Sequence, residues 1–170
     1  MKKYFFLLKL VLFLSVPFVQ VNAQSTLTCN VNGDNYTGIV AEAVQVTIAN
    51  EGFLQVRTQQ ENNGLHLYIK LTKLSGEFPI TLKYAPHSTE NQTLPDAEVI
   101  WVPDPEQPQW NTIEGELVVT AFSQADKTMA GRFEFVVEKA EYGSKKKKTM
   151  DVEDGRFSIT NFNVEKPAKK

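Results

Sequence analysis

Few side chains in this sequence are of the types that carry out catalysis or bind metals. The only two histidines, His66 and His87, lie far apart, and the single cysteine is Cys29. Because a zinc site needs three or four ligands at suitable spacing, we expect neither a metal nor a cofactor. The chain also lacks a G-x-S-x-G nucleophile elbow and a glycine-rich phosphate loop. These absences predict a protein that is not an enzyme.

Carboxylates are the one type of potentially catalytic side chain that is numerous in this sequence. Glu114 and Glu116 share one face of a predicted strand, and Glu134 and Glu138 could lie near them across a hairpin. A pair of carboxylates at the right separation hydrolyses glycosides, although acidic residues on an outward strand face more often keep a protein soluble. Glycan hydrolysis is therefore the alternative function. Two short acidic segments, 30–34 and 151–155, lack the twelve-residue loop of a calcium site and instead predict hairpin turns.

The segment from Trp101 to Trp110 is the strongest candidate for binding. It contains both tryptophans of the chain and three prolines, in the order W-V-P-D-P-E-Q-P-Q-W. Prolines stiffen a loop and reduce the entropy lost on binding, and aromatic rings stack on sugars or pack against a partner. We expect Trp101 in the core and Trp110 exposed to solvent. The alternative is a loop that only caps one end of the fold.

A run of four lysines is the second candidate. Adjacent like charges repel one another, so we expect residues 145–148 to form a solvated hairpin tip. If this run contacts an anionic surface, binding should weaken steeply with salt. The candidate ligand-binding or partner-binding residues are therefore Trp101, Trp110, Lys145, Lys146, Lys147 and Lys148.

Residues 1–23 are typical of a secretory signal peptide. A basic start, Met1-Lys2-Lys3, precedes a nearly apolar stretch from Tyr4 to Val19, and V-N-A at 21–23 supplies the small-residue pattern of a cleavage site. An uncleaved membrane anchor is the competing interpretation, but the apolar stretch is short and interrupted for a span. We expect export to the periplasm, the cell surface or the medium. One domain over residues 24–164 should follow, with a charged tail over 165–170 and no membrane span after processing.

The net charge of the chain argues against one class of partner, and its single cysteine limits the covalent cross-links it can form. The chain has 18 basic and 20 acidic residues; residues 1–23 hold three lysines and no acid, which leaves 15 basic residues and a net charge of −5. An acidic body argues against nucleic-acid binding. Cys29 cannot form an internal disulfide, and it alternates with polar neighbours as a core residue does. Thr26-Leu27-Thr28 separates Cys29 from the apolar stretch, so we do not expect a lipid-modified cysteine.

Alternation of apolar and polar side chains predicts an all-β fold. Residues 113–135 form two alternating runs joined by a polar turn at 123–126, with Leu117, Val119 and Ala121 expected on one face. No stretch has a helical period. About nine or ten short strands with hairpin connections favour a single antiparallel β-sandwich or flattened barrel, and the sequence does not decide between the two. The other predicted strands are 26–31, 36–40, 44–48, 53–58, 65–72, 80–84, 97–102 and 157–159, with turns at Asn32-Gly33 and Asp154-Gly155.

Four of these segments carry a pattern that resembles a known family. They are V-N-G-D-N-Y-T at 31–37, G-E-L-V-V-T at 115–120, A-G-R-F-E-F at 130–135 and D-G-R-F at 154–157. The chain resembles an uncharacterised family, a domain of unknown function, of exported β-domain proteins from Bacteroidota-type Gram-negative envelopes. Many members of that family are lipoproteins, whereas this chain has an ordinary signal peptide. The resemblance implies an envelope or secreted location and no activity.

These observations lead to one expected function and one alternative. We expect a non-enzymatic binding or structural accessory protein of the cell envelope or exterior, whose partner is an envelope protein or a glycan. Two close acidic residues lining a groove would favour the hydrolase, and a convex acidic surface would favour the accessory protein.

Overall fold

A computed structural model of the chain describes residues 24–86, 94–139 and 147–165. This part of the chain contains ten strands and a 3₁₀ turn, η1 (Leu71–Lys73), but no α-helix. The strands are β1 (Thr26–Val31), β2 (Asp34–Ile48), β3 (Glu51–Gln60), β4 (Asn63–Lys70), β5 (Ile80–Lys83), β6 (Ala97–Val102), β7 (Trp110–Ser123), β8 (Thr128–Lys139), β9 (Lys148–Ile159) and β10 (Asn163–Val164).

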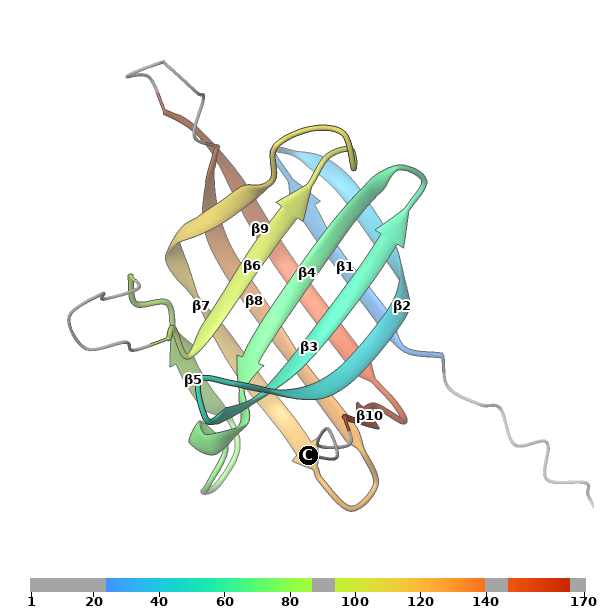
Figure 1. The fold of residues 1–170 in the computed structure, drawn as a ribbon, viewed down its shortest axis with the longest axis vertical. Helices are drawn as coiled ribbons and strands as arrows, with labels where there is room; N and C mark the ends of the chain where they lie inside the picture. The colour runs from blue at the N-terminus through green and yellow to red at the C-terminus, as the bar shows by residue number, and fades with distance from the viewer. Residues whose placement is uncertain (1–23, 87–93, 140–146, 166–170) are drawn as a thin grey trace, which may run out of the picture.

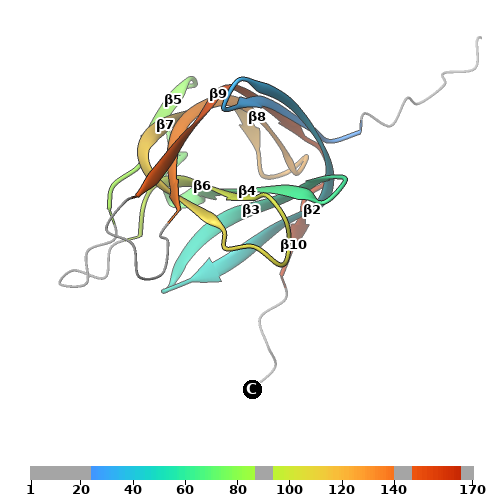
Figure 2. The same ribbon diagram turned by 90° about the horizontal axis from the view of Figure 1, so that it is seen from above.

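Eight of the strands form a closed antiparallel barrel (Figures 1 and 2). The hydrogen-bonded order is β1-β9-β8-β7-β6-β4-β3-β2, and β1 also pairs with β2, which closes the ring. β5 lies outside this ring and pairs with β7, while β10 adds a parallel pair to β2. The predicted all-β antiparallel meander is confirmed, and of the two architectures left open by the sequence the protein adopts the barrel.

Apolar side chains fill the interior of the barrel. Successive residues of a strand point to opposite faces, so β4 buries Leu65, Leu67 and Ile69 completely while His66 and Tyr68 lie half-buried on the outside. Inward residues from all eight ring strands join one continuous hydrophobic cluster. An eight-stranded barrel is just wide enough for its own side chains to fill it. The structure therefore has a packed core, as the alternation predicts.

Glycines and aromatic rings meet across the strands β7, β8 and β9. Gly115 pairs with Phe135, Gly131 with Phe157, and Gly155 with Phe133. At each glycine an added methyl group would come closer than 3.0 Å to the paired ring. The rings thus occupy space that only glycine leaves open, which allows this wall of the barrel to curve tightly.

Four details of the predicted strands are wrong. The strand predicted at 65–72 ends at Lys70, because Leu71 and Thr72 belong to η1. Residues 36–40 and 44–48 belong to one strand, β2, which continues through a bulge between Val40 and Glu42. Asp154-Gly155 is not a hairpin turn but a bulge inside β9, with a positive φ of 52° at Asp154. A bulge between Val119 and Ala121 reverses the alternation in β7. Ala121 is therefore exposed, and Phe122 instead turns toward the core and stacks on Phe162.

A buried lysine fixes the end of the barrel near the 3₁₀ turn. Lys70 is only 4 % exposed, and its ammonium group lies 2.8 Å from Glu51 and 3.4 Å from Asp96. It also donates a hydrogen bond to the carbonyl oxygen of Leu94 at 3.0 Å. Because a buried charge is tolerated only when paired, this network holds the segment before β6 against β3 and β4.

Candidate binding site at one end of the barrel

The upper end of the barrel in Figure 1 is where β1, β3, β6 and β8 finish and β2, β4, β7 and β9 begin. It carries the tight turns Asn32-Gly33 and Glu61-Asn62 and the β6–β7 loop, residues 103–109. Figure 1 shows this loop arching at the top of the barrel. Mouths of β-barrels are frequent ligand sites, so this end is the natural place to look for a binding function.

A depression of about 250 Å³ opens at this end. Its floor is apolar: Tyr36 and Trp101 are 3 % and 7 % exposed, and Val31 and Met150 lie beside them. Among the described residues, no lysine or arginine lines the depression. The rim consists of polar side chains from the two turns and the adjoining strand ends, namely Asn32, Asp34, Asn35, Gln60, Glu61 and Asn63.

The aromatic floor is held rigidly from below. The ring centroids of Tyr36 and Trp101 lie 5.3 Å apart at an interplanar angle of 87°, an edge-to-face contact. Thr58 donates its hydroxyl proton to the carbonyl oxygen of Leu65 at 2.9 Å, so the Tyr36 hydroxyl must donate to Thr58, at 2.8 Å. Burial is the main cause of a raised pKa at Tyr36. The phenol therefore stays protonated and keeps its place in this hydrogen-bonded chain.

The rim of the depression offers both donors and acceptors. Amide side chains do both, whereas the carboxylates of Asp34 and Glu61 only accept. Since the described lining residues include these two carboxylates and no basic side chain, this lining carries a net negative charge. The site can bind hydroxyl or amino groups and disfavours anionic groups.

The structure confirms only part of the prediction for the two tryptophans. Trp101 is buried in the core, as expected. Trp110, expected to be exposed to solvent, is instead the first residue of β7 and pairs with Trp101 across the strands. It is half-buried against the core, and the Lys139 ammonium lies 5.9 Å from its ring centroid. Of the two tryptophans, Trp101 lines the depression and Trp110 does not.

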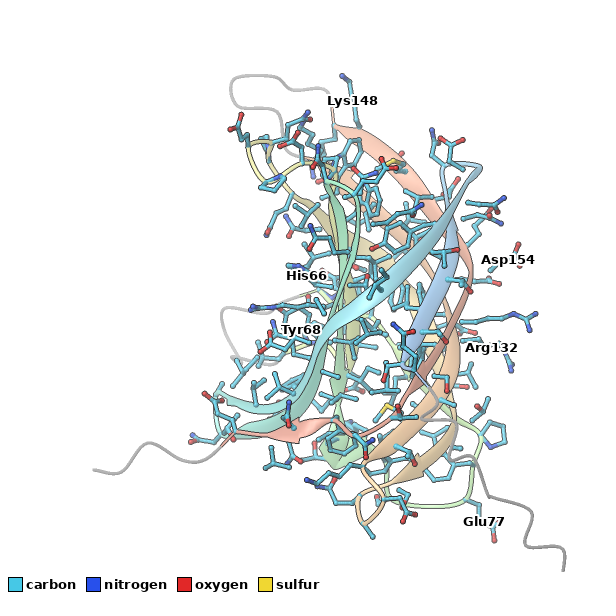
Figure 3. All side chains as sticks on the ribbon, turned by 90° about the vertical axis from the view of Figure 1, so that its right-hand side faces the viewer. His66, Tyr68, Glu77, Arg132, Lys148 and Asp154 are labelled. Atoms are coloured by element: carbon cyan, nitrogen blue, oxygen red, sulfur yellow. The ribbon has the colours of Figure 1, made fainter. Side chains whose placement is uncertain are left out.

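The lysine run is only partly within the described residues. Lys145 and Lys146 lie outside them, so the expected solvated tip stays a prediction for these two. Lys147 is exposed and pairs with Glu138 at 2.9 Å. Lys148 is not a turn residue but the first residue of β9, opposite Lys139. Both described lysines are at the upper end of the barrel, as Figure 3 shows for Lys148.

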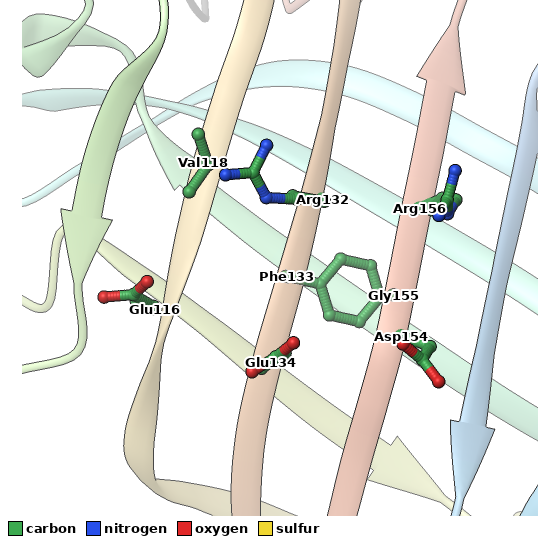
Figure 4. A pocket seen from close by; sticks show the side chains of 8 residues that line it. All are labelled: Glu116, Val118, Arg132, Phe133, Glu134, Asp154, Gly155 and Arg156. Carbon is green, nitrogen blue, oxygen red and sulfur yellow. The ribbon is translucent and has the colours of Figure 1, made fainter.

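The candidate carboxylates lie on the outer wall of the barrel. Glu116 of β7 is directly opposite Glu134 of β8, and both are exposed. They line a shallow depression of about 120 Å³ (Figure 4) and a neighbouring one of about 440 Å³ that also includes Glu114. Glu138 does not join them, because it faces Asn111 and pairs with Lys147.

The remaining candidate groups do not converge. His66 lies on the outer wall (Figure 3), where burial and the nearby Arg57 lower its pKa; His87 is outside the described residues. Cys29 is buried, as predicted, and burial raises the pKa of its thiol to about 12. Within residues 24–86, 94–139 and 147–165, no group of three or more His, Cys, Asp or Glu side chains could hold a metal ion.

The sequence analysis missed the residues that complete the depression. The sequence predicts Tyr36 only as the first residue of the strand 36–40 and Asn63 only as part of a tight turn over 61–64, and no motif marks Asn35 or Gln60. A signal was present, because both turns that bring these residues together are short and rich in asparagine. What the sequence does not show is that β1–β2 and β3–β4 end at the same mouth as Trp101.

Comparison with known proteins gives no relative of this chain: no family model, no curated protein and no solved structure matches it. The resemblance to the exported envelope family thus stays a prediction. In the part of the chain that the structure describes, there is no helix with the length and apolar character needed to cross a membrane.

Proposed function

We propose that this protein is an exported, non-enzymatic binding protein of the cell envelope or exterior, and that its ligand is a neutral glycan. The observation that carries the proposal is one concave site whose described lining combines an aromatic floor with a rim of amides and carboxylates and includes no basic residue. The proposal of export rests on residues 1–23, which lie outside the described residues.

The chemistry of a sugar matches both parts of this site. A pyranose has C–H groups on its faces and hydroxyl groups around its edge, so it contacts apolar rings and hydrogen-bonds to amides at the same time. The depression, about 250 Å³, is smaller than the roughly 300–1,000 Å³ typical of drug-sized pockets. It therefore suits about one sugar residue, with the rest of an oligosaccharide extending past the β6–β7 loop.

Binding can be followed by the fluorescence of Trp101 and by saturation-transfer NMR with soluble neutral oligosaccharides. Asn35→Ala and Asn63→Ala each remove one rim amide and should weaken binding by roughly 3–10-fold, the equivalent of one hydrogen bond. Asn62→Ala is the matched control, because Asn62 is exposed and directly precedes Asn63 but does not line the depression. Oligosaccharides built of uronic acids should bind more weakly than neutral ones.

Equal affinity in the rim variants and the control would place any glycan site elsewhere. If no neutral oligosaccharide binds and the wild type instead retains an envelope protein that the rim variants do not retain, the partner is a protein and not a glycan.

Glycan hydrolysis is the second candidate, and the pairing of Glu116 with Glu134 in a shared depression favours it. Opposite residues have Cβ atoms about 4.5–5.5 Å apart, which is compatible with the roughly 5–5.5 Å between the carboxyl groups of retaining enzymes. Both side chains are exposed, however, whereas a general acid is held in an apolar setting that keeps it protonated. We expect no release of reducing ends. If the wild type releases reducing ends and Glu134→Gln abolishes that release, the protein is a hydrolase instead.

A further inference from the structure

Charged side chains on the outer wall of β7, β8 and β9 are sorted into rows of one sign. The acidic row contains Glu116, Glu134 and, in the bulge beside Glu134, Asp154. The next row contains Val118, Arg132 and Arg156, with the two arginines directly opposite each other. Figure 4 shows the three carboxylates on one side of the shallow depression and both guanidinium groups on the other.

The described residues give these charges few partners inside the molecule: the Asn30 side-chain amide donates a hydrogen bond to Asp154 at 3.2 Å, and Lys83 of β5 lies opposite Glu116 in register. All five charged side chains are exposed, and none of the ion pairs between described residues includes any of them. Like charges directly opposite each other destabilise an antiparallel pair. An alternating arrangement of the same residues would avoid this cost. The sorted rows thus create a surface that matches the complementary charge pattern of a second molecule.

We propose that this wall is a docking surface for a second copy of the chain in antiparallel orientation. A two-fold axis that lies in the contact plane and runs across the strands, between the two rows, places β8 over β8 and β9 over β9. Glu134 of each copy then faces Arg132 of the other, and Asp154 faces Arg156. A symmetric interface of this kind repeats each contact, so both ion pairs form twice.

The rows on either side fit the same arrangement. Beyond the acidic row lie Glu114, Val136 and Asp151, and beyond the arginine row lie the small uncharged residues Ala121, Ala130 and Ser158. The antiparallel axis brings these two outer rows together, so the additional acids meet no acid of the second copy. The small side chains let the two walls approach closely.

The charge rows also exclude the parallel alternative. With the axis along the strands, the acidic row would face the acidic row and the arginines would face arginines, which repel at short range. Only the antiparallel dimer is complementary, and in it the two upper-end depressions open in opposite directions. Because the contact covers few strands and its pairs are near solvent, the dimer should be weak and should dissociate as salt rises.

Sedimentation velocity of the purified protein over a range of concentrations and salt tests the proposal. The wild type should form dimers at low salt. Arg132→Glu alone and Glu134→Arg alone should each weaken dimerisation by roughly tenfold or more, because each places like charges opposite one another. An equimolar mixture of the two variants, or the double variant Arg132→Glu/Glu134→Arg, should restore dimers, since each recreates opposite charges across the axis.

The matched controls are Glu77→Lys and Glu106→Lys, which reverse exposed charges away from this wall and should leave dimerisation nearly unchanged. A wild type that sediments as a monomer at roughly millimolar concentration and low salt would overturn the proposal. So would dimers that both single variants retain, or single-variant losses that neither the mixture nor the double variant reverses. Circular dichroism of each variant establishes that it is folded.

Discussion

Replacing Gly131 with alanine tests the close packing of glycine and aromatic residues in the barrel wall. An added methyl group would lie 2.6 and 2.7 Å from two carbons of the Phe157 ring and would also press against the carbonyl oxygen of Val118. The ring can rotate slightly, but the carbonyl belongs to the backbone of β7, which is paired with β8 throughout this region. The variant must therefore shift the backbone or distort the ring.

The expected loss follows from two opposing effects. Overpacking of a tightly packed site costs roughly 1–3 kcal/mol, whereas the lower entropy of alanine in the unfolded chain returns about 0.4–1 kcal/mol. Gly131→Ala should thus lower the free energy of unfolding by about 1–2 kcal/mol. Gly52→Ala is the matched control, because the nearest atom to its added methyl is Gln45 Nε2 at 4.0 Å. That variant should be neutral or more stable by up to about 1 kcal/mol.

Urea denaturation of both variants, followed by circular dichroism, gives the two free energies from the midpoints and slopes. The reasoning predicts a higher midpoint for Gly52→Ala than for Gly131→Ala, with unchanged slopes. Equal midpoints would refute the claim that the ring and the Val118 carbonyl leave no room at residue 131. A double variant with Phe157→Leu should recover only part of the loss, since the contact with the carbonyl remains.

Three further predictions follow from the burial of individual side chains. Trp101→Ala should lower the free energy of unfolding by about 3–5 kcal/mol, because it leaves a cavity in the core. Trp110→Ala should lower it clearly less, because Trp110 is half-buried. Equal falls in melting temperature for the two variants would contradict this difference. Cys29, whose thiol pKa is raised to about 12 by burial, should react with a thiol reagent at pH 8 only after unfolding, and rapid labelling of the native protein would show that it is accessible. His66 has a lowered pKa in the fold, so the stability that it contributes is present above its ordinary pKa and is lost as the pH falls through its folded pKa. His66→Gln should therefore reduce the fall in the free energy of unfolding over this pH range. An unchanged pH dependence would show that other groups cause the fall.

Most of the fold follows from local patterns in the sequence. The bounds predicted for 26–31 and 97–102 agree with β1 and β6, because strict alternation ends there at turn or loop residues. The patterns fail where bulges intervene. Nothing in the local sequence marks the extra residue before Ala121. The Asp154-Gly155 bulge cannot be distinguished locally from a hairpin turn, because a bulge of this kind and a hairpin turn each need a residue with positive φ.

The candidate site was less accessible to sequence reasoning than the strands. Trp101 stood out because tryptophan and proline are rare, but its partner Tyr36 lies far away in the chain and meets it only after the barrel closes. The rim amides carry no motif of their own. Closure itself depends on β1 pairing with both β2 and β9, which is a long-range choice that periodicity within each strand cannot specify.

The closed ring makes the strand with which the chain begins almost arbitrary. The start of β1 and the residue after β9 are already tied together, because the backbone N–H of Thr160 donates to the Ser25 hydroxyl at 2.8 Å. A short peptide joining these two points would convert the eight-stranded ring into a loop without ends. Such a loop could be opened at any tight turn, for instance between β3 and β4, and every pair of neighbours in the ring would survive. Circular permutants of this protein would then share one architecture while differing only in which hairpin is synthesised first.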